Sequence, residues 1–529
     1  MNKDIAVIDL FAGPGGLGEG FSSLKVENYH PFEIKISVEK EESAHKTLTL
    51  RSFYRKFSGK GVPKEYYEYL RDERLGTSHL SNSYPEEWES ARKETLYGPK
   101  ELGNAEHDRI VFGRLKEIKR AHDGPFVVIG GPPCQAYSVM GRVKNSSLKG
   151  YIAEDDRRNF LYKEYLKVLA EVQPEVFVME NVRGLVTAKV HGEPIFPKIL
   201  KDLECPGAAL ELTQGTTTKQ HYYIYSLVKE PDNKLASDNY PNYQDLNDYV
   251  IKAEDYGVPQ SRHRVILLGV RKDLALKKTP RTLVPGRKVH VKDVIGDLPN
   301  VRSGVSKEED SPESWKKIVQ EVGFDLAGKL FSSGRSELAE KVLSVANNLT
   351  VPRKKRGHKR FLKYNLNSSL ENEKLANFYL DSSLGGILNH YARGHMRSDL
   401  QRYMFCASYA ELNRRDRNPS PTKSEFPGFL APKHKSWDSG KFSDRFRVQI
   451  KNRYATTITS HIGRDGHYFI HYDPKQCRSL TVREAARIQT FPDNYCFEGN
   501  QTQQYVQVGN AVPPYLARQI AGIVFQLIQ

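Results

Sequence analysis

The sequence predicts an α/β fold built on an open, mostly parallel β-sheet with helices on both faces. Four short apolar runs, typical of buried strands, occupy residues 5–11, 126–129, 176–179 and 265–270. Three of them end directly in glycine, proline or polar residues, and ligands of such sheets bind at the carboxyl ends of the strands. Residues 160–172 carry apolar side chains at helical spacing, so strand and helix alternate.

The composition limits the class of protein. A length of 529 residues suggests two to four domains, and the net charge of +16 favours a polyanionic partner, although a merely basic surface is the alternative. No apolar run reaches the ~18 residues that a membrane span needs, so we expect no membrane association. Five cysteines without a C-x-x-C pair favour a reducing cytoplasm and give no support to a metal site.

The chain divides into three stretches of different character. Residues 1–302 carry the strand–helix pattern, interrupted at about 41–109 by a charged stretch that we interpret as a helical insertion without assigned chemistry. Residues 303–455 contain basic clusters and few long apolar runs, which predicts a second, smaller domain. Residues 456–529 return to the first domain and include a helix at 479–488, whose start has a capping-box pattern.

A glycine-rich turn follows the first predicted strand. Glycine lets the backbone approach a ligand closely, and the next helix offers unpaired N–H groups. Alone, this turn could serve NAD, a nucleotide or S-adenosylmethionine, or be only a tight turn. Glu39 ends a second strand-like stretch and suits hydrogen bonds to ribose hydroxyls, with a surface glutamate as the alternative.

Reactive groups follow the later strands. Cys134 lies in a stiff Gly-Gly-Pro-Pro-Cys turn, where an exposed nucleophile is a better interpretation than a core thiol. Arg262 and Arg264 supply positive charge just before the fourth run, or are ion-pair partners at the surface. Glu180 directly follows a buried strand, which is costly unless the carboxylate is paired or functional.

Six segments in order, residues 9–21, 130–138, 180–182, 260–264, 478–495 and 507–514, resemble the motifs of DNA cytosine-5 methyltransferases of the bacterial restriction-modification type. The resemblance implies the Rossmann-like fold of S-adenosylmethionine-dependent methyltransferases. It also implies that residues 303–455 form a variable target-recognition domain. The region between 271 and 476 matches only in fragments, and the sequence gives no readable code for the DNA target.

The resemblance also implies roles for single residues. Cys134 matches the nucleophile that adds to cytosine carbon 6, and Glu180 matches the carboxyl group that contacts N3 and the exocyclic amine. Arg264 matches the arginine that holds this glutamate and the base, with Arg262 as a nearby active-site or DNA contact. Two further residues match the start of the loop that closes over DNA: Gln135 and Ser138.

For the cofactor, the resemblance implies S-adenosylmethionine, with S-adenosylhomocysteine as the product. Glu39 matches the ribose contact, Leu161 the apolar wall beside the adenine, and Asn510 a late position of the pocket. The long stretch 41–109 obscures the acidic residue that normally contacts adenine, and Asp108 fits that role poorly. The glycine-rich cofactor loop is matched by Phe11, Gly13, Gly15, Gly16 and Leu17.

The implied partner is double-stranded DNA, bound by a monomer in the bacterial cytoplasm and therefore at the nucleoid, with a cognate restriction endonuclease acting separately. Because the target atom lies inside the duplex, the base must be flipped out. An RNA cytosine methyltransferase is the nearest alternative, but the large segment at 303–453 favours DNA. The intact set of Cys134, Glu180 and Arg264 argues against a silent DNA-binding protein, and a nicotinamide oxidoreductase leaves the Pro-Pro-Cys-Gln sequence unexplained.

Two features of the second domain have competing interpretations. The basic run at 353–360 suits phosphate contacts or a solvated face better than a targeting signal. His390 and His395 lie close together in the sequence, but no partner is spaced to complete a metal site, so we expect structural or DNA-backbone roles. We also expect arginines of this domain, Arg393 for example, to affect the choice of target.

Overall fold

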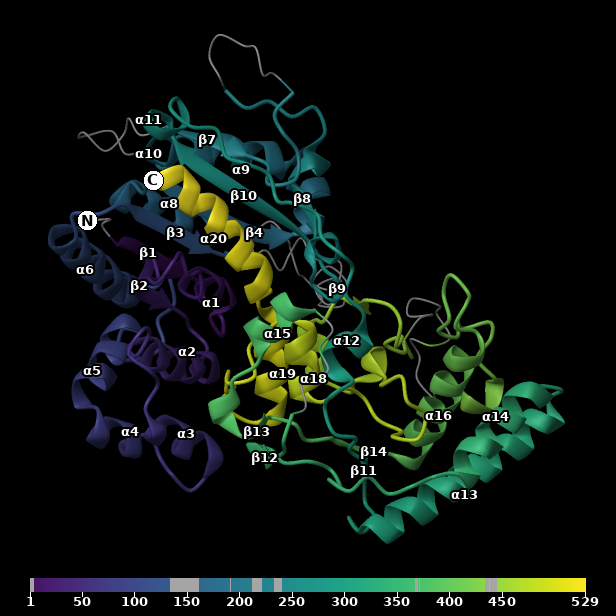
Figure 1. Ribbon diagram of the computed structural model, residues 1–529. Coiled ribbons are helices and arrows are strands. Elements are labelled where there is room, and N and C mark those ends of the chain that lie inside the picture. Colours follow the sequence, from purple (N-terminus) through teal and green to yellow (C-terminus); the bar gives the residue numbers. More distant parts are fainter. Residues whose placement is uncertain are drawn as a thin grey trace.

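The computed structural model describes residues 4–133, 161–190, 192–211, 221–232, 240–366, 370, 372–432, 437 and 445–529. Figure 1 shows two parts, with the β-sheet and both labelled termini in the upper one and mainly helices in the lower one. A pair of long helices, α13 (Pro312–Ser332) and α14 (Ser336–Asn347), projects from the lower part on the side away from the sheet.

The central sheet has seven strands and confirms the α/β prediction. Its order is β2-β1-β3-β4-β10-β7, with β8 also paired to β10. The first four run parallel, whereas β10 runs antiparallel to β4, β7 and β8. The strands are β1 (Ile5–Leu10), β2 (Phe32–Val38), β3 (Phe126–Gly130), β4 (Val176–Val182), β7 (Tyr222–Tyr225), β8 (Val250–Lys252) and β10 (His263–Arg271).

The reversed direction of β10 is the feature of the sheet that the apolar runs do not predict. A buried run has the same composition in either direction, so its pattern carries no polarity. Reversal aligns Arg264 at the start of β10 with Val182 at the end of β4. The arginine motif therefore lies at the edge of the sheet where the parallel strands end.

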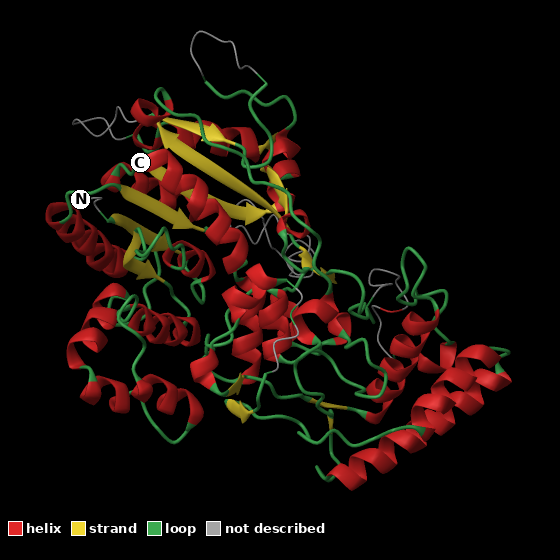
Figure 2. Cartoon of the chain, in the orientation of Figure 1, coloured by secondary structure: helices red, strands yellow, loops and turns green. Residues whose placement is uncertain are grey.

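Helices cover both faces of the sheet, because side chains alternate between the faces along each strand. On one face, Val7, Val178 and Ile266 pack against α1 (Gly16–Ser22) and α20 (Pro514–Ile528). On the other face, the covering helices are α6 (Ala105–Ala121), α8 (Leu161–Val172) and α9 (Ile195–Glu204). Figure 2 shows these helices around the strands, and α8 confirms the helix predicted at 160–172.

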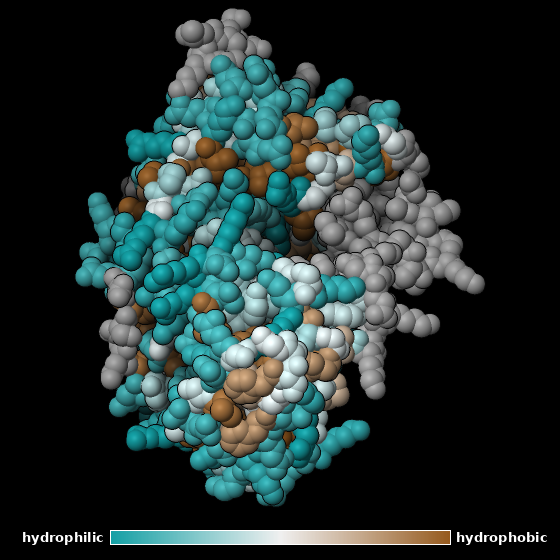
Figure 3. Space-filling view, turned by 90° about the vertical axis from the view of Figure 1, so that its right-hand side faces the viewer, coloured by the Kyte–Doolittle hydropathy of each residue, from teal (hydrophilic) through white to brown (hydrophobic). Residues whose placement is uncertain are grey.

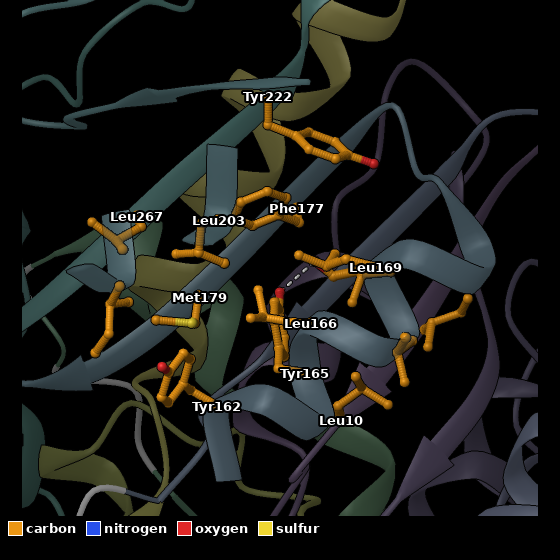
Figure 4. Close-up of a cluster of buried hydrophobic side chains, with 14 of the residues drawn as sticks. Leu10, Tyr162, Tyr165, Leu166, Leu169, Phe177, Met179, Leu203, Tyr222 and Leu267 are labelled. Carbon is orange, nitrogen blue, oxygen red and sulfur yellow. Dashed lines mark hydrogen bonds between the residues drawn. The ribbon is translucent and has the colours of Figure 1, made fainter. Parts of the chain in front are cut away.

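The core under α8 joins the central strands (Figure 4). Phe177, Met179 and Leu267 belong to the same buried cluster as Leu166 and Leu169 of α8, and Met179 and Phe177 lie on the strand side of it in this view. Burial of each such side chain stabilises the fold by about 1.5–3 kcal/mol. The Tyr165 hydroxyl has hydrogen-bond acceptors within this core, because it lies 3.2 Å from the Val128 carbonyl and 3.1 Å from the Val178 carbonyl.

The charged stretch at 41–109 is helical. It forms four helices around a small core rich in aromatic rings, which includes Phe53, Phe57, Tyr66 and Tyr69, and it ends in the first turn of α6. In Figure 1 these helices hang below the sheet, beside the lower part. They are α2 (Glu42–Arg55), α3 (Lys64–Arg71), α4 (Ser78–Ser83) and α5 (Pro85–Glu94).

The lower part has two cores. The first packs α13 and α14 against α16 (Arg397–Leu412). The second joins α12 (Val291–Ile295) and α15 (Glu373–Tyr379) to α18 (Val482–Ile488) and α19 (Gln501–Asn510). Within residues 456–529, α20 is the helix that covers the sheet. The domain limits at 302 and 455 stay a prediction. Short strand pairs also lie in this part: β11 (Gly304–Val305) with β14 (Gly394–His395), and β12 (Phe361–Lys363) with β13 (Gly386–Leu388).

Helix α18 begins as its sequence predicts. The Thr481 hydroxyl accepts from the Glu484 N–H (3.2 Å), and the Glu484 carboxylate accepts from the Thr481 N–H (2.7 Å), which completes the capping box. The helix itself starts at Val482, three residues after the start of the predicted range.

Three fully buried arginines, Arg478, Arg483 and Arg487, lie in and just before α18 and form what we call the arginine hub. Arg478 pairs with Glu484 through two contacts of 2.7 Å. Arg487 pairs with Asp493 and Asp297. Arg483 instead donates to the carbonyl oxygens of Leu388, Pro492 and Tyr495. The hub thus connects segments that are far apart in the chain.

Hydrophilic residues cover most of the face shown in Figure 3, and a recess opens between its upper and lower parts. Within the described residues, no helix has both the length and the apolar character that crossing a membrane requires.

Candidate active site

The turn after β3 is attached to the neighbouring strand β4. The buried Asn181 amide donates to the Pro132 carbonyl at 3.1 Å. This contact fixes the backbone two residues before Cys134. Cys134, Gln135 and Ser138 themselves lie outside the described residues, so their predicted roles stay predictions.

Glu180 and Arg264 form an ion pair at the edge where β4 ends. Arg264 Nε lies 2.9 Å from Glu180 Oε1, and the two side chains are 18% and 13% exposed. A Cβ atom on Gly131 would lie 3.1 Å from Glu180 Oε2, so this carboxylate lies against the turn that leads to Cys134. Burial lowers the pKa of Arg264, and the Glu180 carboxylate opposes that shift. The pair can present a fixed carboxyl group to a polar ring that enters this edge.

Arg262 contacts the returning chain rather than the Glu180 carboxylate. Its side chain is 2% exposed and donates to the carbonyls of Ile458 (2.9 Å) and Gly509 (3.2 Å). Burial lowers its pKa, with repulsion from Arg264 as the next cause. The structure therefore shows Arg262 connecting the arginine motif to the returning chain, and its catalytic role stays a prediction.

The Glu39 carboxylate organises the glycine-rich loop at the end of β2. It accepts from the Gly13 N–H at 2.7 Å through Oε2 and from the N–H groups of Lys40 (2.9 Å) and Glu41 (2.7 Å) through Oε1. Burial raises its pKa, and these N–H groups oppose the shift. Each carboxylate oxygen keeps further lone-pair capacity, which suits a hydroxyl-bearing ligand such as a ribose.

One side of the glycine-rich loop packs against other segments, and the side at Gly13 is open. Phe11, Gly13 and Gly15 have positive φ values of 53°, 58° and 95°. A Cβ on Gly15 would lie 2.8 Å from Leu48 and 2.9 Å from the Tyr495 hydroxyl, and one on Gly16 would lie 2.2 Å from the Val512 carbonyl. A Cβ on Gly13 would meet nothing within 4 Å. This open cradle fits a cofactor that approaches the backbone closely.

The remaining predicted cofactor residues differ in their surroundings. Leu17 is buried in the core under α1, so its side chain is unavailable to a ligand. Leu161 is half-buried at the start of α8. Asn510 is exposed at the end of α19, two residues before the Val512 carbonyl that faces Gly16. The backbone at Leu17 and the side chains of Leu161 and Asn510 stay candidates.

Comparison with known proteins decides the family. The model of the C-5 cytosine-specific DNA methylase family matches residues 81–208, 219–323 and 346–526. The chain belongs to this family. It is 32% identical to the type II methyltransferase M.Bpa9945I of Bacillus paralicheniformis, over 99% of both chains.

Two further relatives align with the greater part of the chain. The type II methyltransferase M.AgeI of Thalassovita gelatinovora is 26% identical and aligns over 75% of this chain and 81% of its own. The DNA (cytosine-5-)-methyltransferase M.ApeKI of Aeropyrum pernix is also 26% identical, over 76% and 81%. The resemblance seen in the sequence is thus confirmed, and the chain is an enzyme of the DNA (cytosine-5-)-methyltransferase type.

Asp9 is one of the buried acids of the methyltransferase that the sequence analysis did not single out. Asp9 lies in β1, is 1% exposed, and takes a hydrogen bond from the Gly18 N–H under the glycine-rich loop. Within the described residues its Oδ1 has no hydrogen-bond partner. Burial raises its pKa to about 8. A charged residue inside the apolar run at 5–11 was the available signal.

Asp108, the weak candidate for the adenine contact, has a local role in the methyltransferase. Its carboxylate accepts from the Gly103 N–H at 2.9 Å, near the start of α6. This contact caps the turn before the helix, and an adenine contact by Asp108 stays a prediction.

The two histidines that the sequence analysis considered as metal ligands, His390 and His395, are engaged in the fold. His390 Nδ1 lies 3.0 Å from the Thr481 hydroxyl, and its Nε2 lies 2.9 Å from the Pro299 carbonyl. Burial lowers the pKa of His390 to about 4. His395 is also buried, and its ring contacts the Tyr403 ring. Among the described residues, no group of three or more His, Cys, Asp or Glu side chains could hold a metal ion.

Some basic side chains of the predicted second domain are held by contacts within the protein, and others are exposed to solvent. Arg356 pairs with Asp310 (2.7 Å), and Arg360 donates to the Tyr69 carbonyl (3.2 Å). Arg393 donates to the Ile462 (2.7 Å) and Arg464 (3.1 Å) carbonyls, so its predicted effect on target choice remains untested. The exposed Lys and Arg side chains of the run, Arg353, Lys355 and Lys359, suit phosphate contacts, and Lys359 also lies 5.8 Å from the centre of the Tyr391 ring.

Proposed function

We propose that this methyltransferase transfers a methyl group from S-adenosylmethionine to carbon 5 of a flipped-out cytosine in a specific duplex site. The reaction proceeds through a covalent Cys134 adduct and leaves S-adenosylhomocysteine. The observation that supports this proposal is the Glu180–Arg264 pair, 2.9 Å apart, against the turn that leads to Cys134.

The chemistry follows from the poor nucleophilicity of cytosine carbon 5. The Cys134 thiolate adds to carbon 6, which makes a sulfur–carbon bond and moves electron density to carbon 5. Glu180 holds a proton at N3 as that density develops, and Arg264 keeps the carboxyl group in place. Once carbon 5 carries the methyl group, water takes its proton and the bond from Cys134 to carbon 6 breaks.

The glycine-rich loop supplies the site for the methyl donor. Glu39 would hold the ribose, and the open side of Gly13 would face the ligand. When bound, S-adenosylmethionine supplies an electrophilic methyl group on a sulfonium. Phe11, Leu161 and Asn510 would complete the pocket around it. The glycine-rich loop follows β1 and Glu180 lies near the end of β4, and both strands pair with β3, so a donor held by the loop would lie at the same edge of the sheet as Glu180.

We further propose that residues 303–455 read the target in double-stranded DNA. Base flipping is required because the reacting atoms of cytosine lie inside the duplex. The relatives named type II methyltransferases support a role in restriction-modification, in which a separate endonuclease is the partner and methylation protects host DNA. The enzyme would act as a monomer in the bacterial cytoplasm, bound to the nucleoid.

The test is a pair of cysteine variants assayed on two substrates, duplex DNA and tRNA. Cys134→Ala should abolish transfer of a tritiated methyl group from S-adenosylmethionine to duplex DNA, while DNA binding in a gel shift persists. Cys205→Ala, which changes a half-buried cysteine in the same domain, should keep full activity. Transfer to tRNA instead of DNA would contradict the proposed substrate.

A mechanism-based trap gives a second reading. With duplex DNA that contains 5-fluorocytosine at the target, the wild type and Cys205→Ala should form an adduct that survives denaturation, because fluorine blocks the final elimination. An adduct of equal yield in Cys134→Ala would overturn the nucleophile assignment.

A further inference from the structure

We propose that the helical insertion α2–α5 is a brace that positions the cofactor helix α1 relative to the target-recognition segment, with Arg51 and Tyr67 as its positioning residues. This inference rests on the proposed function, because it concerns the alignment of the methyl donor with the target base. It gives the charged stretch at 41–109 a role that its sequence alone does not indicate.

The charge of the insertion argues against a DNA-binding role. Residues 41–109 contain 12 basic and 13 acidic residues, a net charge of −1 in a chain of net charge +16. Phosphate binding requires an excess of Lys and Arg. Instead, the insertion places its polar groups against the rest of the protein.

One end of the insertion holds the cofactor helix. Arg51 of α2 makes two contacts with Glu19 of α1, at 2.6 and 2.8 Å, and the two side chains are 5% and 4% exposed. Its third donor bonds Asn494 Oδ1 at 2.9 Å. The guanidinium also lies 4.8 Å from the centre of the Tyr495 ring, whose hydroxyl donates to the Pro14 carbonyl in the glycine-rich loop.

The other end holds the second domain. The Tyr67 hydroxyl donates to Asp381 at 2.7 Å, and Arg71 donates to the Leu384 carbonyl at 3.1 Å. Leu384 and Leu388 are buried in the aromatic core of the insertion. In Figure 1, α3 accordingly lies on the side of the lower part that carries β12 and β13.

The two ends are connected through shared partners. Asn494 accepts from Arg51 and donates to Asp381 at 2.7 Å, which is the same carboxylate that Tyr67 contacts. A second connection runs from the Tyr69 hydroxyl to Glu498 at 3.0 Å. The glycine-rich loop and residues 381–388 are thus attached to the same helical insertion. A misplacement of about 1 Å between reacting groups can slow a reaction about 100-fold, so this attachment matters for methyl transfer.

The test removes single hydroxyl groups and leaves the rings in place. Tyr67→Phe, Tyr69→Phe and the double variant cut the bonds from the insertion to Asp381 and Glu498. Tyr84→Phe is the matched control, because its hydroxyl donates to Glu65 at 3.0 Å within the insertion. The rate of methyl transfer in a single turnover should fall about five-fold or more in the double variant and less than about two-fold in the control.

Binding separates positioning from folding. Affinity for S-adenosylmethionine, measured by calorimetry, and for duplex DNA, measured by fluorescence anisotropy, should stay within about two-fold of the wild type in all four variants. A double variant that transfers methyl as fast as Tyr84→Phe overturns the proposal. So does a loss of rate that is fully matched by weaker binding of one substrate.

Hydrogen exchange tests the brace without methyl transfer, so that failure of the proposed function is recognised separately. Wild-type protein without transfer to any duplex would contradict the proposed function, not the brace. In the double variant, amides of residues 373–388 should exchange faster than in Tyr84→Phe, and in Arg51→Met those of α1 should. Unchanged exchange in both would overturn the brace.

Discussion

The interior of the sheet and that of the arginine hub are stabilised by different interactions. The sheet buries apolar side chains on both faces and keeps the Glu180–Arg264 pair at its edge. The hub buries Arg478, Arg483 and Arg487 completely and gives each a set of carboxylate or carbonyl partners. The first arrangement tolerates volume-conserving changes, whereas the second depends on every charge keeping its partner. The two regions should therefore differ in response to substitution and pH.

The largest effect is expected from Arg478→Met. It leaves the Glu484 carboxylate, which is 2% exposed, without its ion-pair partner. Breaking a buried pair from one side costs about 3–5 kcal/mol, and urea unfolding of the variant should show that loss. Arg397→Met is the control, because Arg397 pairs with Glu308 and Glu321 at the surface, where a loss below about 1 kcal/mol is expected. Equal losses in the two variants would remove the distinction between hub and surface.

The next largest effect is a loss of stability at low pH around the arginine hub. His390 contacts Thr481 at the start of α18, and His471 lies 3.7 Å from Glu484, the partner of Arg478. Burial lowers the pKa of both His390 and His471 to about 4, from an ordinary value of 6.5. Between pH 6.5 and 4 the unfolded chain therefore binds more protons than the native protein, and the free energy of unfolding falls as the pH falls. Urea titrations at pH 7, 6, 5 and 4.5 would show the decline. His471→Gln should flatten it, and a decline of the same steepness in that variant would contradict the assignment.

At Asp9 in the sheet, stability should depend on pH in the opposite direction and to a smaller extent than at the two histidines together. Its pKa is raised from 3.8 to about 8, so between these values the native protein binds more protons than the unfolded chain. Its contribution to stability is therefore present at low pH and is lost as the pH rises through 8. Asp9→Asn should gain in melting temperature relative to the wild type as the pH rises from 5 to 8.5. A difference that does not vary with pH would refute the charge cost at this position.

The sequence predicts what depends on local pattern. Apolar runs locate β1, β3, β4 and β10, and Thr481 with Glu484 locates the start of α18. The direction of β10 depends instead on the non-local pairing of Arg264 with Val182, which no periodicity encodes. The resemblance could pair Glu180 with Arg264, but only the fold shows Arg262 donating to carbonyls about 200 residues later.

The contacts of the basic run at 353–360 were harder to predict because its basic residues look alike in the sequence. Arg356 and Arg360 are anchored in ion pairs, whereas Arg353 and Lys355 of the same run are exposed. The contacts that make the difference come from Asp310 and Glu498, far along the chain. Spacing alone therefore cannot separate a structural arginine from a phosphate ligand.

The glycine-rich loop has a consequence for how the enzyme is made. Tyr495 and Val512 hold this loop from behind, and Tyr495 lies 481 residues after Pro14, whose carbonyl it contacts. At about 5–20 residues per second, a ribosome needs about 25–100 s to cover that interval. The glycine-rich loop thus waits for a segment that is made much later before it reaches its final form. A growing chain therefore has no finished glycine-rich loop until synthesis has passed Val512.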